Sequence, residues 1–248
     1  MGKMKKALTA FAIGISVLLG AQEYTSPRYT VKIFDRYLKD SGLNRVILDK
    51  KRIINRNILF CWVKNGDKNE RLAERLTPEY KFSDNILSSN KKLVDKNGKE
   101  FAEITRTMQF KPDSIQVEVT AKALTNWTIP NTWSGYREIL LLPTDQMIGT
   151  TIEVIRKKDG TKSMAVIPKV FDRKLWSLDG RGCENIKMIF EQYAVTVTAS
   201  EGTTMNFGHY GGNKIELAVL PIFKPYELEM KAGTTRQWNY TLTFEKLQ

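Results

Sequence analysis

Residues 126–138 gather three aromatic rings beside amide and charged groups, in the order NWTIPNTWSGYRE. Such a set can hold a sugar, because aromatic faces pack on the C–H surfaces of the ring while polar side chains hydrogen-bond its hydroxyls. A proline and a glycine in the stretch indicate a loop, where exposed aromatic rings favour a ligand. The same rings can instead plug one end of a core. The candidate binding residues of this stretch are Trp127, Trp133, Tyr136, Arg137 and Glu138.

A second candidate is His209, the single histidine of the chain, which lies in the sequence NFGHYGG. Its side chain suits general acid–base work, because the pKa of histidine lies near neutrality. We add the neighbouring Tyr210 to the candidate ligand-binding residues. A single histidine beside glycines is more often an ordinary loop residue. Glu191, Glu201 and Glu216 lie near it in sequence, and nothing selects one of them as a partner, so no catalytic residue is assigned.

Other motifs for chemistry are absent from the sequence. There is no G-x-S-x-G nucleophile elbow, phosphate loop or dinucleotide fingerprint. Two cysteines and one histidine are too few for a zinc cluster, so we expect no metal and no cofactor. Tyr136 and Glu138 would share one face of a strand while Arg137 points away, so this triplet is not a complete site for a polysaccharide lyase.

Alternation of apolar and polar residues with period two is the main structural signal. It is clearest at residues 115–123, 193–199 and 237–245. Half-buried antiparallel strands produce this pattern. Asn-Gly and Asp-Gly dipeptides, which favour tight turns, predict hairpins over residues 91–109 and 152–167. The best helix candidate is residues 68–76. We therefore predict an all-β fold with little helix, namely a large antiparallel two-sheet β-sandwich.

Four stretches in this order resemble the large two-sheet supersandwich of galactose mutarotases, a fold related to that of polysaccharide lyases. They are SGLNRVILD (41–49), LVDKNGKEF (93–101), FKPDSIQV (110–117) and KAGTTRQWNYTLTF (231–244). The resemblance implies the same sandwich and a role with carbohydrates. Mutarotase chemistry uses paired histidines and a carboxylate, and the chain has one histidine. The resemblance therefore does not extend to the catalytic set.

Residues 1–21 have the layout of a secretory signal peptide. Lys3, Lys5 and Lys6 precede an apolar run over residues 7–19, and small residues lead to a predicted cut after Ala21. The apolar run is too short for a membrane-spanning helix. We expect residues 22–248 to form one β-sandwich domain, exported to the periplasm or the extracellular space.

The net charge of +12, from 39 Lys and Arg against 27 Asp and Glu, falls to +9 (12 − 3) once the three leader lysines are removed. Outside the cytoplasm this excess does not indicate nucleic acid, and clusters such as Lys157-Lys158 are typical of solvated turns. In an oxidising compartment Cys61 and Cys183 permit a disulfide, although a buried thiol is as natural for Cys61 in its apolar run.

Together these observations indicate an exported carbohydrate-binding or accessory protein without catalytic activity. The expected partner is a carbohydrate, with anionic polysaccharide included, and we expect neither nucleic-acid binding nor stable membrane insertion. Two alternatives stay open. One is an enzyme acting on sugars, of the aldose epimerase or polysaccharide lyase kind, and the other is a structural or interaction protein of the cell envelope.

Overall fold

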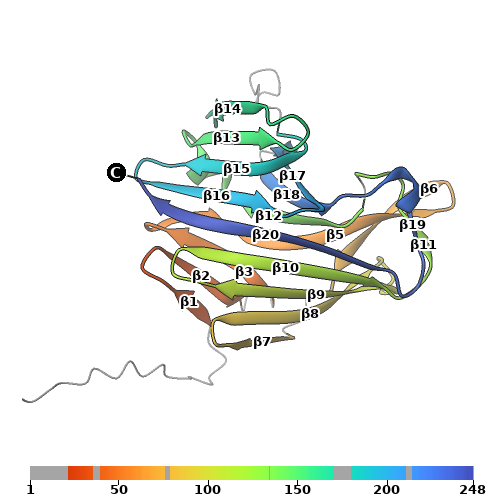
Figure 1. Cartoon of the computed structure of the whole chain (residues 1–248). Coiled ribbons are helices and arrows are strands. Elements are labelled where there is room, and N and C mark those ends of the chain that lie inside the picture. The colour runs from red at the N-terminus through yellow and green to blue at the C-terminus, as the bar shows by residue number, and fades with distance from the viewer. Residues whose placement is uncertain are drawn as a thin grey trace, which may run out of the picture.

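Antiparallel β-strands make up most of the described chain (Figure 1). The computed structural model describes residues 22–35, 40–75, 79–133, 135–169, 180–210 and 214–247. The predicted signal peptide lies outside these residues. The nearly all-β fold with little helix predicted from the alternation is confirmed.

The first four strands form a small antiparallel sheet of their own, in the order of the chain. They are β1 (Glu23–Thr25), β2 (Tyr29–Asp35), β3 (Asp40–Leu48) and β4 (Lys51–Ile54). Strand β3 lies against β5 of the large sheet, and its buried side chains Leu43, Val46 and Leu48 join the main hydrophobic core. The small sheet thus covers part of the inner face of the large one.

The large sheet holds fourteen strands of the described chain, and Figure 1 shows its first half stacked from β14 at the top to β7 at the bottom. In spatial order they are β14 (Lys162–Val166), β13 (Thr151–Arg156), β15 (Cys183–Ile189), β16 (Tyr193–Ala199), β20 (Thr235–Lys246), β10 (Ser114–Ala123), β9 (Glu100–Phe110), β8 (Ile86–Val94), β6 (Lys68–Glu74), β5 (Arg56–Asn65), β12 (Arg137–Leu142), β18 (Lys214–Pro221) and β17 (Thr203–Tyr210), while β7 (Tyr80–Ser83) pairs with β8.

Hydrogen bonding runs around this sheet without a full break. Strand β17 pairs back with β15 through Cys183 and Met205, which closes the sheet on itself. The joint between β6 and β8 is also narrow, with two residue pairs formed by Ala73 and Glu74. The prediction of two separate sheets therefore differs from the observed pairing. The pairing is one continuous antiparallel sheet with two narrow joints.

Period-two alternation places the core on the inner face of the sheet. Val117, Val119, Tyr240 and Leu242 are buried on neighbouring strands β10 and β20, while the residues between them face outward. The predicted strands at 115–123, 193–199 and 237–245 are confirmed as parts of β10, β16 and β20. The two predicted hairpins are also confirmed, as β8–β9 and β13–β14.

The predicted helix at residues 68–76 is wrong. Residues 68–74 form strand β6, which pairs with β5 across the turn at Gly66. The segment is rich in Lys, Glu, Arg and Leu, which suit a helix, but Leu72 and Glu74 alternate into the interior. Pairing with the neighbouring strand and burial on one face override the weak preference of these residues for helix.

Short elements complete the described chain. They are helix α1 (Thr144–Met147), the 3₁₀ turn η1 (Pro225–Glu227), and the two-stranded ribbon of β11 (Trp127–Thr128) and β19 (Glu229–Met230). No helix in the described ranges combines the length and apolar character needed to cross a membrane. Cys61 and Cys183 are both buried as thiols, so of the two alternatives for them the structure has the buried thiol.

Candidate functional site

A pocket of about 410 Å³ opens where the loop before β12 meets the turn between β13 and β14. We call it the Trp133 pocket, because the Trp133 side chain on its wall is 54% exposed. Ile222, 44% exposed, adds a second apolar surface. The lining residues come from five separate segments: Thr132, Trp133, Lys157, Lys158, Gly182, Thr204, Leu220, Pro221, Ile222 and Phe223.

Local contacts hold the loop that carries Trp133. The Trp133 backbone N–H donates to the side-chain oxygen of Asn131 at 3.0 Å, which fixes the turn before the ring. Gly135 follows, and an added Cβ there would lie 2.3 Å from the Phe223 ring. Glycine therefore lets Phe223, 7% exposed, pack under the loop as part of the pocket floor.

The opposite wall is basic. Lys157 Nζ donates to the backbone oxygen of Thr203 at 3.0 Å, so its ammonium group is anchored beside β17. Lys158 is exposed on the same turn. The carboxylate of the neighbouring Asp159 accepts one hydrogen bond from the Arg156 side chain and another from the Thr161 backbone N–H. Together these two hydrogen bonds lower the pKa of Asp159 far below its usual range. Since Arg156 engages that carboxylate, the lysines give the pocket a positive wall.

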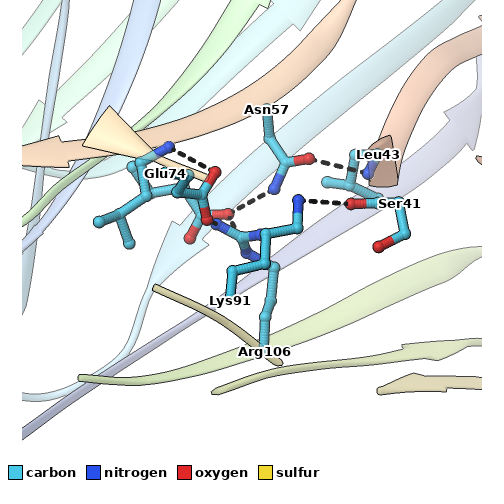
Figure 2. A network of polar contacts seen from close by, with 8 residues as sticks. Ser41, Leu43, Asn57, Glu74, Lys91 and Arg106 are labelled. Atoms are coloured by element: carbon cyan, nitrogen blue, oxygen red, sulfur yellow. Dashed lines mark hydrogen bonds and ion pairs between the residues drawn. The ribbon is translucent and has the colours of Figure 1, made fainter. Parts of the chain in front are cut away.

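A second group of polar side chains lies deep between the small sheet and the large sheet (Figure 2). Arg106 on β9 contacts two carboxylates, Glu74 Oε1 at 2.8 Å and Glu138 Oε1 at 3.0 Å. All three side chains are at most 2% exposed. Lys91 on β8 is also buried, so two cations face two carboxylates. We call Glu74, Lys91, Arg106 and Glu138, with Asn57, the ionic network.

Hydrogen bonds link the ionic network to the small sheet. Asn57 donates to Glu138 at 2.7 Å and accepts from the backbone N–H of Leu43 at 2.9 Å. Lys91 Nζ donates to the backbone oxygen of Ser41 at 3.2 Å. Both Ser41 and Leu43 belong to β3, so the network fastens the small sheet to the inner face of the large one (Figure 2).

The charges in the ionic network balance the cost of burial. Burial by itself raises the pKa of Glu74, but Arg106, Lys91 and the Leu59 N–H together bring the pKa below its ordinary value. Burial opposes the charge of Arg106, yet Glu74 and Glu138 raise its pKa above the usual range. Burial and the nearby Glu138 charge raise the pKa of Tyr240. Glu74 and Arg106 are therefore held in their charged forms, although both side chains are sealed from solvent.

The structure separates the aromatic residues predicted as one site. Tyr136 is fully buried and stacks on Trp238 with ring centroids 5.7 Å apart. Trp127, 7% exposed, meets Tyr136 edge-on. These two rings fill the interior of the protein, and their faces are covered by other residues. This agrees with the alternative hypothesis for the stretch, that its rings close one end of the core. Trp133 is the ring of this stretch that is open to solvent.

The polar residues that were predicted to share a site with these rings also lie apart from one another. Glu138 is fully buried in the ionic network, and Arg137, on the opposite face of β12, lies over the Phe60 ring at 5.7 Å. His209 pairs with Ile215 near the far end of β17, five residues from Thr204 of the pocket, or roughly 17 Å along the strand. Tyr210 follows it. The side chains of His209 and Tyr210 lie outside the described part.

Several residues at these sites were not identified from the sequence. Lys157 and Lys158 matched a solvated turn, and their approach to Trp133 depends on tertiary packing that no local pattern records. Arg106 carried a usable signal, since it falls on the apolar face of its strand between Ile104 and Met108. A charged residue at such a position indicates a buried partner. Among described residues, no group of three or more His, Cys, Asp or Glu side chains is placed to hold a metal ion.

Comparisons with known proteins place the fold. No protein-family model matches the chain, and no curated protein matches it in sequence. Solved structures do match. A galactose mutarotase-like protein from Lactobacillus casei has a TM-score of 0.57 at 10% identity, over 91% of this chain and 100% of that one. An aldose epimerase homologue from C. elegans has a TM-score of 0.56 at 11% identity, over 92% of this chain and 99% of that one.

A putative aldose 1-epimerase from Escherichia coli K12 also matches, with a TM-score of 0.53 at 10% identity over 92% of this chain and 100% of that one. The protein therefore has the galactose mutarotase-like fold, as its sequence stretches indicated. The matches cover 91–92% of this chain and 99–100% of the chains that it matches. At identities near 10% they define the fold, and the function must be argued from the residues of this chain.

Proposed function

We propose that this protein is an exported, non-catalytic carbohydrate-binding protein that holds a sugar in the Trp133 pocket. The observation that carries the proposal is the exposed Trp133 ring beside two lysines and an apolar floor. An indole face packs on the C–H surface of a sugar, and Thr132 and Thr204 add hydroxyl groups for hydrogen bonding. The mutarotase-like fold of the neighbours, several of them described as sugar epimerases, supports a role with sugars.

The charge of the pocket favours an acidic sugar. Lys157 and Lys158 lie on one wall, and the carboxylate of Asp159 is engaged by Arg156. A uronic acid or a sulfated sugar would place its anion against the ammonium groups while its ring lies on Trp133. Charge-assisted hydrogen bonds of this kind are stronger than neutral ones. We therefore propose an anionic polysaccharide as the ligand.

The proposal of a non-catalytic role rests on where the titratable groups lie. Glu74 and Glu138, carboxylates that could serve acid–base chemistry, are sealed in the ionic network. The single histidine, at position 209, is five residues along β17 from the pocket residue Thr204. An acid and a base must both reach the reacting atoms of a sugar to transfer protons.

We also propose that the large sheet acts as the two layers of the predicted supersandwich. The narrow joints at β6–β8 and β15–β17 divide it into two broad arcs. Side chains from both arcs, such as Val119 on β10 and Leu59 on β5, belong to the same hydrophobic core. In this view the joints are the edges where one layer passes into the other.

Calorimetric titration of the mature protein with polygalacturonate, alginate and dextran tests the binding. We expect an acidic polymer to bind and Trp133→Ala to weaken it about tenfold, which corresponds to ~1.4 kcal/mol. Lys158→Ala should weaken it and reduce its dependence on salt. Tyr226→Ala is the matched control, since Tyr226 is 75% exposed and lies outside the pocket. Equal weakening by Tyr226→Ala, or no binding to either acidic polymer, would rule the proposal out.

The same polymers separate binding from catalysis. Incubation with polygalacturonate and alginate should produce no absorbance from unsaturated uronates, and anomeric exchange of free aldoses should proceed at the uncatalysed rate. Formation of either product by the folded wild-type protein would instead establish the enzyme alternative. Export has its own test: amino-terminal sequencing of the protein recovered outside the cytoplasm should begin at Gln22.

A further inference from the structure

The outer face of β8, β9, β10 and β20 carries a grid of hydroxyl and amide side chains. One cross-strand row consists of Ser88, Thr107, Glu118 and Asn239. The next row along the same strands places Gln109 opposite Gln116, and Gln116 opposite Thr241. These residues alternate with core residues such as Met108 and Tyr240, which fixes the grid on the solvent side.

This face is hollowed into a groove of about 370 Å³. We call it the polar groove. Six of its lining residues contribute hydroxyls or amides: Thr107, Gln109, Gln116, Ser200, Asn239 and Thr241. Ile86, 37% exposed, gives an apolar edge. The volume lies within the range of pockets that hold small organic ligands.

Charge is sparse in the polar groove. Among the described residues that line it, Glu118 is the one that carries a charge, and its carboxylate accepts a hydrogen bond from the Gln237 amide. Elsewhere the outward positions are often charged, as at Lys64, Lys68 and Arg71 on β5 and β6. Charged residues make up 27% of the whole sequence, so the composition of the groove is a local departure.

We propose that the polar groove binds a neutral polysaccharide chain. A sugar hydroxyl both donates and accepts, and amides and hydroxyls offer both functions in return. Directly opposed side chains such as Gln109 and Gln116 stand about 5 Å apart, so they can bond to neighbouring hydroxyls of one chain. A neutral sugar whose hydroxyls are hydrogen-bonded here avoids the cost of desolvating a charge, whereas an anion would lose hydration without gaining a cation among the described lining residues.

The composition also disfavours a protein partner. The core of a protein–protein interface is enriched in aromatic residues, Met and Arg. The groove offers amides and hydroxyls instead, and its one aromatic residue, Tyr240, turns its ring into the core with 1% of the residue exposed. A carbohydrate of neutral character fits these groups better than a second copy of the chain does.

The polar groove is distinct from the Trp133 pocket, and this inference does not rest on the proposed function. The turn after β16 separates them, with Ser200 on the groove side and Gly202 accepting a backbone hydrogen bond from Ile222 on the pocket side. Gln109 and Gln116 lie on β9 and β10, and neither residue lines the Trp133 pocket. Substitutions there can change the groove and leave the pocket intact.

Affinity electrophoresis of the mature protein, in gels containing hydroxyethylcellulose, mixed-linkage β-glucan or dextran, tests the inference. We expect at least one of these neutral polymers to retard the wild-type protein. Gln109→Ala with Gln116→Ala should weaken the apparent affinity at least fivefold, and Thr107→Arg should block the groove by bulk and charge. Asn69→Ala with Gln192→Ala is the matched control, since both amides are exposed outside the groove.

Each outcome decides for or against the groove, with thermal unfolding showing that every variant is folded. Retardation that is lost in the groove variants and kept in the control and in Trp133→Ala supports it. Retardation lost in Trp133→Ala but kept in the groove variants would assign neutral sugars to the pocket and overturn the inference. Absence of retardation by all three polymers would overturn it as well. So would a dimer in sedimentation that the groove variants dissociate, because a second copy would then occupy the face.

Discussion

The ionic network and the Trp133 pocket use similar residues under opposite conditions. In the network, Arg106 and Lys91 face Glu74 and Glu138 with almost no exposure to water. In the pocket, two lysines lie at the surface, and the described lining residues include no carboxylate. Buried and balanced charge therefore serves to hold two sheets together, whereas exposed and unbalanced charge is available to a ligand.

The largest effect should come from breaking the network. Arg106→Met removes the shared partner of two buried carboxylates and should lower the free energy of unfolding by about 3–5 kcal/mol. Urea unfolding measures the change. Lys122→Met is the matched control, because Lys122 is exposed on the outer face of β10, and it should change stability by less than ~0.5 kcal/mol. Similar losses for both variants would contradict a structural role for the network.

Crowding the pocket floor should have an intermediate effect. Gly135→Ala places a methyl group against Phe223 and should cost about 1–3 kcal/mol of stability, while also weakening ligand binding. Phe223→Leu in the same chain should relieve part of the clash. The double-mutant cycle measures this, and a strictly additive result would show that the two residues do not compete for the same space.

The smallest effect is a change in acid sensitivity. The folded-state pKa of Glu74 is lowered, so its contribution to stability is present above the unfolded pKa of about 4.3 and is lost as pH falls through the folded pKa. The loss is about 1.4 kcal/mol for every pH unit between the two pKa values. The free energy of unfolding, measured between pH 6 and pH 3, should therefore change less with pH for Glu74→Gln than for the wild type. An unchanged slope would mean that Glu74 does not carry this dependence.

Much of the sheet could be predicted from sequence, because alternation and turn residues act locally. Strands β10 and β20 each show an unbroken period of two, and Asp159-Gly160 marks the hairpin of β13 and β14. Strand β6 was missed because its charged residues suit a helix as well as a strand. Local preference there is weaker than the pairing with β5 that decides the outcome.

The candidate site was only partly predictable. Trp133 was identified, but the sequence could not tell it from Tyr136, three residues later, whose ring is fully buried. The difference depends on Trp238, which lies 102 residues further along the chain (238 − 136) and stacks on Tyr136. Lys157 and Lys158 come to the pocket from another hairpin. Such contacts between distant segments depend on how the sheet closes. A local sequence pattern does not encode that closure.

The two narrow joints of the large sheet have a dynamic consequence. One pair of residues closes β15 on β17, and two pairs join β6 to β8, whereas β10 and β20 are matched over nine. Backbone groups held by few ladder bonds open at a lower free energy than those within long ladders. Amide hydrogens that bond across these two joints should therefore exchange with heavy water well before those of β10. The sheet would open locally at these two joints while the long ladders between them stay closed.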